Sequence, residues 1–148
     1  MQINYVKGDL FQTGCDVIAH GCNAQGVMGR GVAKTLRQIF PEAYNEYRKT
    51  YLNDGLTVGS VHFVKLPGRI IANCITQEFY SGKKENHIYI DYKAIKKCMW
   101  ILNSECSKNN WSLAMPLIGA GLGGGDWDKI EKIIEKEFTD VIPNVYVL

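Results

Sequence analysis

The sequence predicts an α/β fold, a mixed and largely parallel sheet of about six strands with helices on both faces. Segments with strand patterns alternate with segments of helical pattern along the 148 residues. The segment 113–118 is apolar on both alternations, as expected of a central strand that is buried on both faces. The length suits one domain spanning residues 1–148.

The first half of the chain contains two expected strands and two expected helices. A short alternating strand over 3–6 precedes a buried apolar strand over 16–22. Helices are expected over 31–40 and 42–52, with Pro41 between them. Proline interrupts the first helix and suits the first turn of the second, which predicts a break at this position.

The second half begins with strands expected over 58–66 and 69–75, which flank a Pro-Gly turn and can pair as a hairpin. A polar loop is expected over 76–86. Three elements complete the chain: a long helix over 89–106, a helix over 127–138 and a strand over 145–148.

Composition restricts the classes of partner. The hydrophobic fraction of 46% and the charged fraction of 22% are those of an ordinary globular protein. A formal net charge of +2 is too small to predict a nucleic-acid partner. No segment has the length and apolarity of a membrane span, and the start of the chain resembles a strand rather than a signal peptide. We therefore expect a cytoplasmic monomer that binds neither nucleic acid nor membrane.

The five cysteines predict buried thiols rather than a disulfide framework. Their number is odd and no pair has CxxC spacing, which also disfavours a zinc site. No histidine or carboxylate cluster has the spacing of metal ligands, so neither a metal nor a cofactor is expected.

Two glycine-rich loops each join an expected strand to an expected helix. The first loop contains Gly26, Gly29 and Gly31, and the second spans residues 118–125. Backbone N–H groups at the positive end of a helix receive phosphate, and glycine lets a ligand approach the backbone closely. Both loops follow strands, so both belong at the carboxyl edge of the sheet, where they predict a clamp on a diphosphate.

Three motifs in order resemble those of the macrodomain family. They are Gly8-Asp9-Leu10, then His20-Gly21-Cys22-Asn23 leading to Gly29-Arg30-Gly31-Val32-Ala33, and finally Met115-Pro116-Leu117-Ile118-Gly119-Ala120-Gly121-Leu122-Gly123. The resemblance implies a three-layer α/β/α sandwich that binds ADP-ribose derivatives. A histidine at position 20, where many macrodomains carry asparagine, is similar to the ADP-ribose-1''-phosphate phosphatase branch.

The same resemblance implies roles for the binding residues. Asp9, next to Leu10, matches the aspartate that accepts a hydrogen bond from adenine, although an Asx turn or helix cap would also explain it. Asn23 matches the asparagine that contacts the distal ribose, and Gln77 is a further polar candidate there. The remaining candidates belong to the two loops: Gly29, Arg30, Gly31, Val32, Ile118, Gly119, Ala120, Gly121, Leu122, Gly123 and Gly124.

Three residues are catalytic candidates: His20, Asn23 and Asp126. The imidazole of His20 can transfer a proton or attack phosphorus, or it can be a core histidine bonded to a backbone carbonyl. Asp126 can orient water or a protonated His20, and a helix N-cap explains it equally well. Asn23 can position a water at the anomeric or acyl centre.

The chain departs from the motifs of the family it resembles at three positions. The glycohydrolases and antitoxins of this family carry a catalytic lysine at the position of Gln77 in this chain. The human glycohydrolase type carries an aspartate at the position of Gly123 in this chain. Covalent lysine chemistry is therefore not expected. Arg30 interrupts a usual glycine triplet, and it either supplies charge to a phosphate or tolerates a less demanding backbone angle.

The expected function is hydrolysis of ADP-ribose 1''-phosphate to ADP-ribose and phosphate. Two alternatives stay open. One is hydrolysis of an ADP-ribosyl or O-acetyl-ADP-ribose ester, and the other is a reader that binds ADP-ribose without turnover.

Overall fold

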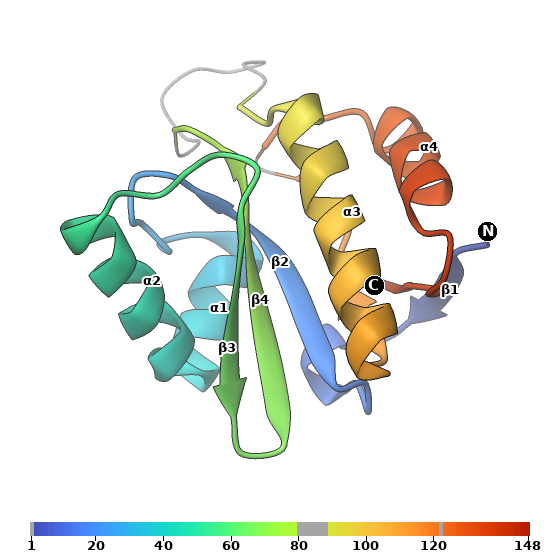
Figure 1. Ribbon diagram of the computed structural model, residues 1–148, viewed down its shortest axis with the longest axis horizontal. Coiled ribbons are helices and arrows are strands. Elements are labelled where there is room, and N and C mark those ends of the chain that lie inside the picture. Colours follow the sequence, from blue (N-terminus) through green and yellow to red (C-terminus); the bar gives the residue numbers. More distant parts are fainter. Residues whose placement is uncertain (1, 80–88, 122) are drawn as a thin grey trace.

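Six strands form one sheet in the order β1-β6-β5-β2-β4-β3 (Figure 1). The computed structural model describes residues 2–79, 89–121 and 123–148. Every neighbouring pair of strands is parallel except β3 and β4, which form the expected antiparallel hairpin. The mixed, largely parallel sheet is thus confirmed. The strands are β1 Asn4–Lys7, β2 Val17–Asn23, β3 Val61–Leu66, β4 Arg69–Gln77, β5 Leu113–Met115 and β6 Asn144–Val147.

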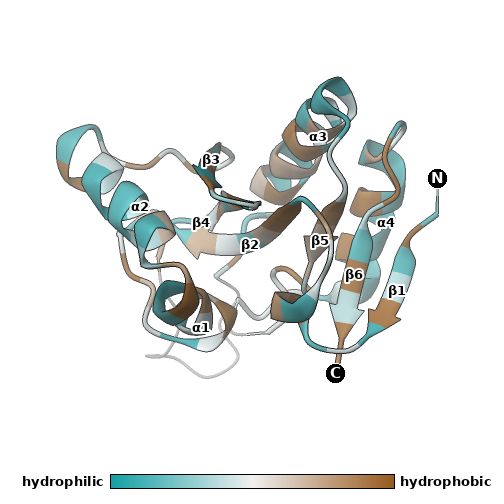
Figure 2. Ribbon diagram, turned by 90° about the horizontal axis from the view of Figure 1, so that it is seen from below, coloured by the Kyte–Doolittle hydropathy of each residue, from teal (hydrophilic) through white to brown (hydrophobic). Residues whose placement is uncertain are grey.

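Two pairs of helices cover the two faces of this sheet, which confirms the three-layer sandwich (Figures 1 and 2). The helices are α1 Gly31–Ile39, α2 Pro41–Asn53, α3 Tyr92–Asn109 and α4 Trp127–Glu137. Among the described residues, no helix is long and apolar enough to cross a membrane. A short 3-10 helix at Leu10–Gln12 follows β1.

The central strand β2 is buried on both faces. Val17 and Ala19 belong to the core formed with α3 and α4, whereas Ile18 belongs to the core formed with Leu36 of α1 and Ala43 of α2. Side chains alternate between the faces of a strand, so a run that is apolar at every position fills both layers. β2 lies between β4 and β5, and its carboxyl end is therefore surrounded by the ends of both neighbours.

Most element boundaries differ from the prediction by one to three residues, and two of these differences have a clear local cause. β5 ends at Met115 rather than residue 118, because Pro116 has no N–H to continue the ladder. α3 starts at Tyr92 rather than residue 89, where the side chain of Asp91 accepts from the N–H groups of Lys93 and Ala94 at 2.9 and 3.2 Å. The polar loop expected over 76–86 starts inside β4, and its part from residue 80 lies outside the described residues.

The N-cap of α3 also ties this helix to β4. The backbone N–H of Asp91 donates to the carbonyl oxygen of Thr76 at 2.9 Å, so the residue that begins α3 is fixed to the end of a strand. We predict that Asp91→Ala lowers the free energy of unfolding by about 1 kcal/mol, because two helix N–H groups lose their acceptor. Urea denaturation measures this change.

The matched control is Asp54→Ala, at the exposed carboxyl end of α2. This change should alter the free energy of unfolding by less than about 0.5 kcal/mol. Equal losses in the two variants would show that the cap contributes no specific stability.

Candidate functional site

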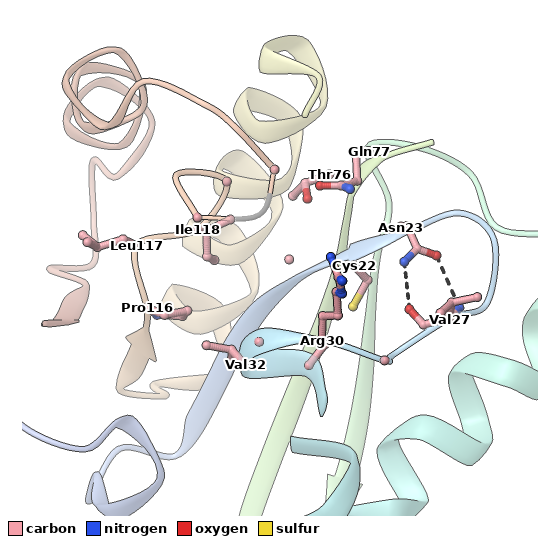
Figure 3. Close-up of a pocket in the computed structure, with 17 residues that line it drawn as sticks. Cys22, Asn23, Val27, Arg30, Val32, Thr76, Gln77, Pro116, Leu117 and Ile118 are labelled. Atoms are coloured by element: carbon pink, nitrogen blue, oxygen red, sulfur yellow. Dashed lines mark hydrogen bonds between the residues drawn. The ribbon is translucent and has the colours of Figure 1, made fainter. Parts of the chain in front are cut away.

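A cavity of about 300 Å³ opens beyond the carboxyl ends of β2, β4 and β5 (Figure 3). Both glycine loops line it, so the structure brings together the two segments that the sequence singled out. The predicted site residues in its wall are Asn23, Gly29, Arg30, Gly31, Val32, Gln77, Ile118, Gly119, Gly121 and Gly123. Their position agrees with the rule that ligands bind at this edge of a parallel sheet.

The first glycine loop presents the start of α1 to the cavity. The first backbone hydrogen bond of α1 runs from the N–H of Lys34 to the carbonyl oxygen of Arg30 at 3.3 Å. The preceding N–H groups, those of Gly31, Val32 and Ala33, lie before any helical acceptor, and all three residues line the cavity. A helix start with free N–H groups and no side-chain cap favours an anion.

Arg30 occupies the middle of the expected glycine triplet without backbone strain. Its φ of −146° and ψ of 157° are extended, whereas the neighbouring Gly31 has the positive φ of 59°. Only position 31 therefore requires glycine for its conformation. The side chain of Arg30 points from the loop toward Cys22 at the end of β2 (Figure 3). It is the one charged side chain among the described residues of the cavity wall.

The side chain of Asn23 holds the first loop together. Its Oδ1 accepts from the N–H groups of Gln25 and Val27 at 3.0 and 3.3 Å and lies 2.9 Å from the hydroxyl of Tyr47. Its Nδ2 donates to the carbonyl oxygen of Val27 at 2.8 Å (Figure 3). An amide has two N–H donors, so one remains for a ligand, whereas the acceptor side is already occupied.

The second glycine loop supplies fewer cavity residues than expected. Ala120 and Gly124 are outside the wall, and their N–H groups donate within the loop, to the carbonyl oxygens of Leu117 at 3.2 Å and of Gly121 at 3.0 Å. The prediction that both offer N–H groups to a diphosphate is corrected accordingly. The predicted binding residue Leu122 lies outside the described residues.

Asp9, Leu10 and Asp126 are also outside the cavity wall. Asp9 accepts from the N–H of Phe11 at 2.9 Å as the N-cap of the 3-10 helix. Asp126 accepts from the N–H of Asp128 at 3.0 Å as the N-cap of α4. Leu10 is buried in the core beneath α1. Both aspartates cap helices, and since the cap uses only Oδ1 of Asp9, the adenine contact expected of Asp9 stays a prediction.

His20 is buried beneath the cavity rather than exposed in it, which corrects the expectation that β2 carries it into the site. Its side chain is 1% exposed, and its Nε2–H donates to Oδ1 of Asn73 at 2.6 Å. The Nδ2 of Asn73 donates in turn to the carbonyl oxygen of Ala43 at 3.2 Å. Burial lowers the pKa of His20 to about 4, against the opposing effect of the Asn73 bond. The imidazole is therefore neutral at pH 7.

Several wall residues were missed from the sequence: Gly21, Cys22, Val27, Ala33, Thr76, Pro116 and Leu117. Most adjoin a predicted residue, so adjacency at a strand end was the available signal. Gly21 has a packing reason, because a Cβ there would lie 3.0 Å from Oγ1 of Thr76. Burial raises the pKa of the Cys22 thiol well above its usual value, so this thiol is neutral. No cluster of three metal-ligating side chains occurs in the part of the chain that the structure describes.

Comparisons with known proteins agree with this geometry. The Macro domain family model matches residues 19–134. An ADP-ribose 1''-phosphate phosphatase from Candida albicans is 28% identical over 99% of both chains. A DNA ADP-ribosyl glycohydrolase from Mycobacterium tuberculosis is 29% identical over 97% of this chain and 40% of its own. A structure of a protein of unknown function from Bacteroides thetaiotaomicron has a TM-score of 0.89 at 32% identity, covering 100% of this chain and 99% of that one.

The burial of His20 predicts a pH-dependent stability. A lowered pKa means that the unfolded chain takes up a proton at His20 below about pH 6.5, while the folded protein takes it up only near pH 4. Stability from this group is complete above pH 6.5 and is lost as the pH falls toward 4. Between pH 7 and pH 4, the wild type should lose roughly 3 kcal/mol more free energy of unfolding than His20→Gln.

Urea denaturation at both pH values measures the difference, which does not depend on the starting stability of the variant. His62→Gln is the matched control, since burial also lowers the pKa of half-buried His62. The His62→Gln variant should keep the contribution of His20 to the pH dependence of the free energy of unfolding. Parallel pH dependence in the wild type and His20→Gln would contradict the assignment.

Proposed function

Because this chain belongs to the macrodomain family, we propose that its cavity binds ADP-ribose and that the protein hydrolyses ADP-ribose 1''-phosphate to ADP-ribose and phosphate. The observation that carries the proposal is the convergence of both glycine loops on one cavity at the carboxyl edge of the sheet. The full-length similarity to a fungal ADP-ribose 1''-phosphate phosphatase supports the choice of reaction.

The two loops are proposed to hold the diphosphate from opposite sides. The free N–H groups at the start of α1 offer a positive end to an anion, and Gly121 of the second loop has open space above its backbone. The side chain of Ile118 contributes an apolar surface on the side of the second loop (Figure 3). Exclusion of water along such a surface strengthens hydrogen bonds to the bound anion.

Hydrolysis of a phosphate monoester requires mainly that the reactants are positioned and that the charge of the transition state is stabilised. A water attacks phosphorus, the bond from phosphorus to the ribose oxygen breaks, and the proton of the water passes to that oxygen. In this proposal the free N–H of Asn23 and the guanidinium of Arg30 stabilise the charge that develops on the phosphoryl oxygens. His20 lies behind Cys22 and serves the fold rather than proton transfer.

A second candidate function, a reader without turnover, is favoured by one observation. Among the described residues of the cavity wall there is no histidine, carboxylate or lysine that could transfer a proton. Gln77, at the position where the related glycohydrolases carry lysine, donates through Nε2 to the carbonyl oxygen of Phe79 at 2.6 Å. The same observations make hydrolysis of an ADP-ribosyl ester the weaker alternative.

We predict that Gly121→Glu weakens ADP-ribose binding by at least about tenfold, because the new carboxylate faces the diphosphate. The side chain fits without strain, since a Cβ at Gly121 meets nothing within 4 Å. Gly14→Glu is the matched control: a Cβ at Gly14 is equally unobstructed, and this residue is outside the cavity wall. Isothermal titration calorimetry with ADP-ribose compares the two variants with the wild type. Equal affinities in all three would contradict the proposed position of the diphosphate.

We predict that the wild type releases inorganic phosphate from ADP-ribose 1''-phosphate, that Gly121→Glu loses this activity, and that His20→Gln keeps kcat within about threefold. The measurement is initial-rate phosphate release at pH 7. Binding of ADP-ribose without phosphate release would favour the reader. A loss of about a hundredfold or more in His20→Gln, with ADP-ribose affinity retained, would instead assign proton transfer to His20.

A further inference from the structure

We propose that Arg30 makes the cavity selective for ADP-ribose derivatives that carry an additional anionic group on the terminal ribose, above all a phosphate monoester. This inference rests on the proposed function, since it concerns the same cavity. It assigns to one side chain the preference of the site for the phosphorylated ligand over ADP-ribose itself.

The position of Arg30 makes its charge available to a ligand. The side chain extends from the start of α1 toward Cys22 at the end of β2 (Figure 3). Arg30 is exposed, and no carboxylate is present among the described residues of the cavity wall. Within the described part of the chain, the guanidinium has neither an ion-pair nor a hydrogen-bond partner. Its five donors are therefore free for an anion.

The fold does not require an arginine at this position. The extended backbone of residue 30 accommodates any residue, and Arg30 makes no side-chain hydrogen bond to the helix it caps. The positive φ beside it belongs to Gly31, so the conformational demand at the start of α1 does not fall on residue 30. A side chain that is dispensable for the loop and directed into the cavity points to a role in ligand binding.

The charge of the ligand explains what that role would be. The neutral N–H groups at the start of α1 and in the second loop can receive a diphosphate, and ordinary ADP-ribose has no other anion. A phosphate monoester adds a charge of about −1.5 to −2 at neutral pH. A planar guanidinium binds phosphate through two parallel hydrogen bonds and keeps its charge at any physiological pH. Arg30 supplies the positive charge that this second anion needs.

The test compares two ligands in three variants. Arg30→Gln removes the charge and keeps hydrogen-bonding capacity, and Arg30→Lys keeps the charge and removes the planar fork. Lys34→Gln is the matched control, because Lys34 is an exposed cation on the same helix and is outside the cavity wall. The readouts are the Kd for ADP-ribose by calorimetry and the affinity for ADP-ribose 1''-phosphate, taken from KM where the ligand is hydrolysed and from Kd where it is not.

In Arg30→Gln, the affinity for ADP-ribose 1''-phosphate should fall by about tenfold or more, while that for ADP-ribose changes by less than about threefold. The affinity of Arg30→Lys for ADP-ribose 1''-phosphate should lie between those of the wild type and Arg30→Gln. The affinity of Lys34→Gln should match that of the wild type. Equal losses for both ligands would place Arg30 at the diphosphate and overturn the proposal, as would no loss for either. If wild type binds neither ligand, the proposed function itself fails, which these measurements distinguish from a failure at Arg30.

Discussion

The parallel pairing of β2 with its neighbours is the constraint on which the site depends. Residues of β2 pair with β4 along nearly the whole strand and with β5 at its start, and α-helical layers bury both faces. All three strands run in the same direction, so the segments that leave them converge at one edge. Because β5 stops at Pro116, the second glycine loop begins early and turns toward the end of β2. The cavity is a consequence of this arrangement rather than of any one loop.

The sequence was sufficient for the architecture because burial on two faces leaves a clear signal. Apolar runs without alternation marked β2 and β5, and Pro41 marked the break between α1 and α2. The sequence was insufficient at element boundaries, where a single residue decides the outcome. The start of α3 depends on an acceptor supplied by Asp91, and the length of β5 depends on the missing N–H of Pro116. Both are local features whose effect appears only once neighbouring elements are in place.

The site was predicted better for backbone than for side chains. A glycine-rich loop before a helix can be recognised from the sequence alone. The cavity is lined by four of the predicted glycines, Gly29, Gly31, Gly119 and Gly121. A polar side chain has several possible uses that share one sequence pattern. Asp9 and Asp126 cap helices, and His20 bonds Asn73 in the core. Asn23 both lines the cavity and organises the loop, so its acceptor is unavailable in a way that no motif reveals.

The extended backbone of Arg30 has a consequence for how related chains can diverge. Since the left-handed conformation at the start of α1 belongs to Gly31 and not to residue 30, position 30 can be replaced without rebuilding the turn or the helix that follows it. A single codon change there alters the electrostatic character of the cavity while leaving the scaffold intact. Position 30 therefore offers evolution, and protein engineering, a place where ligand preference can drift independently of folding.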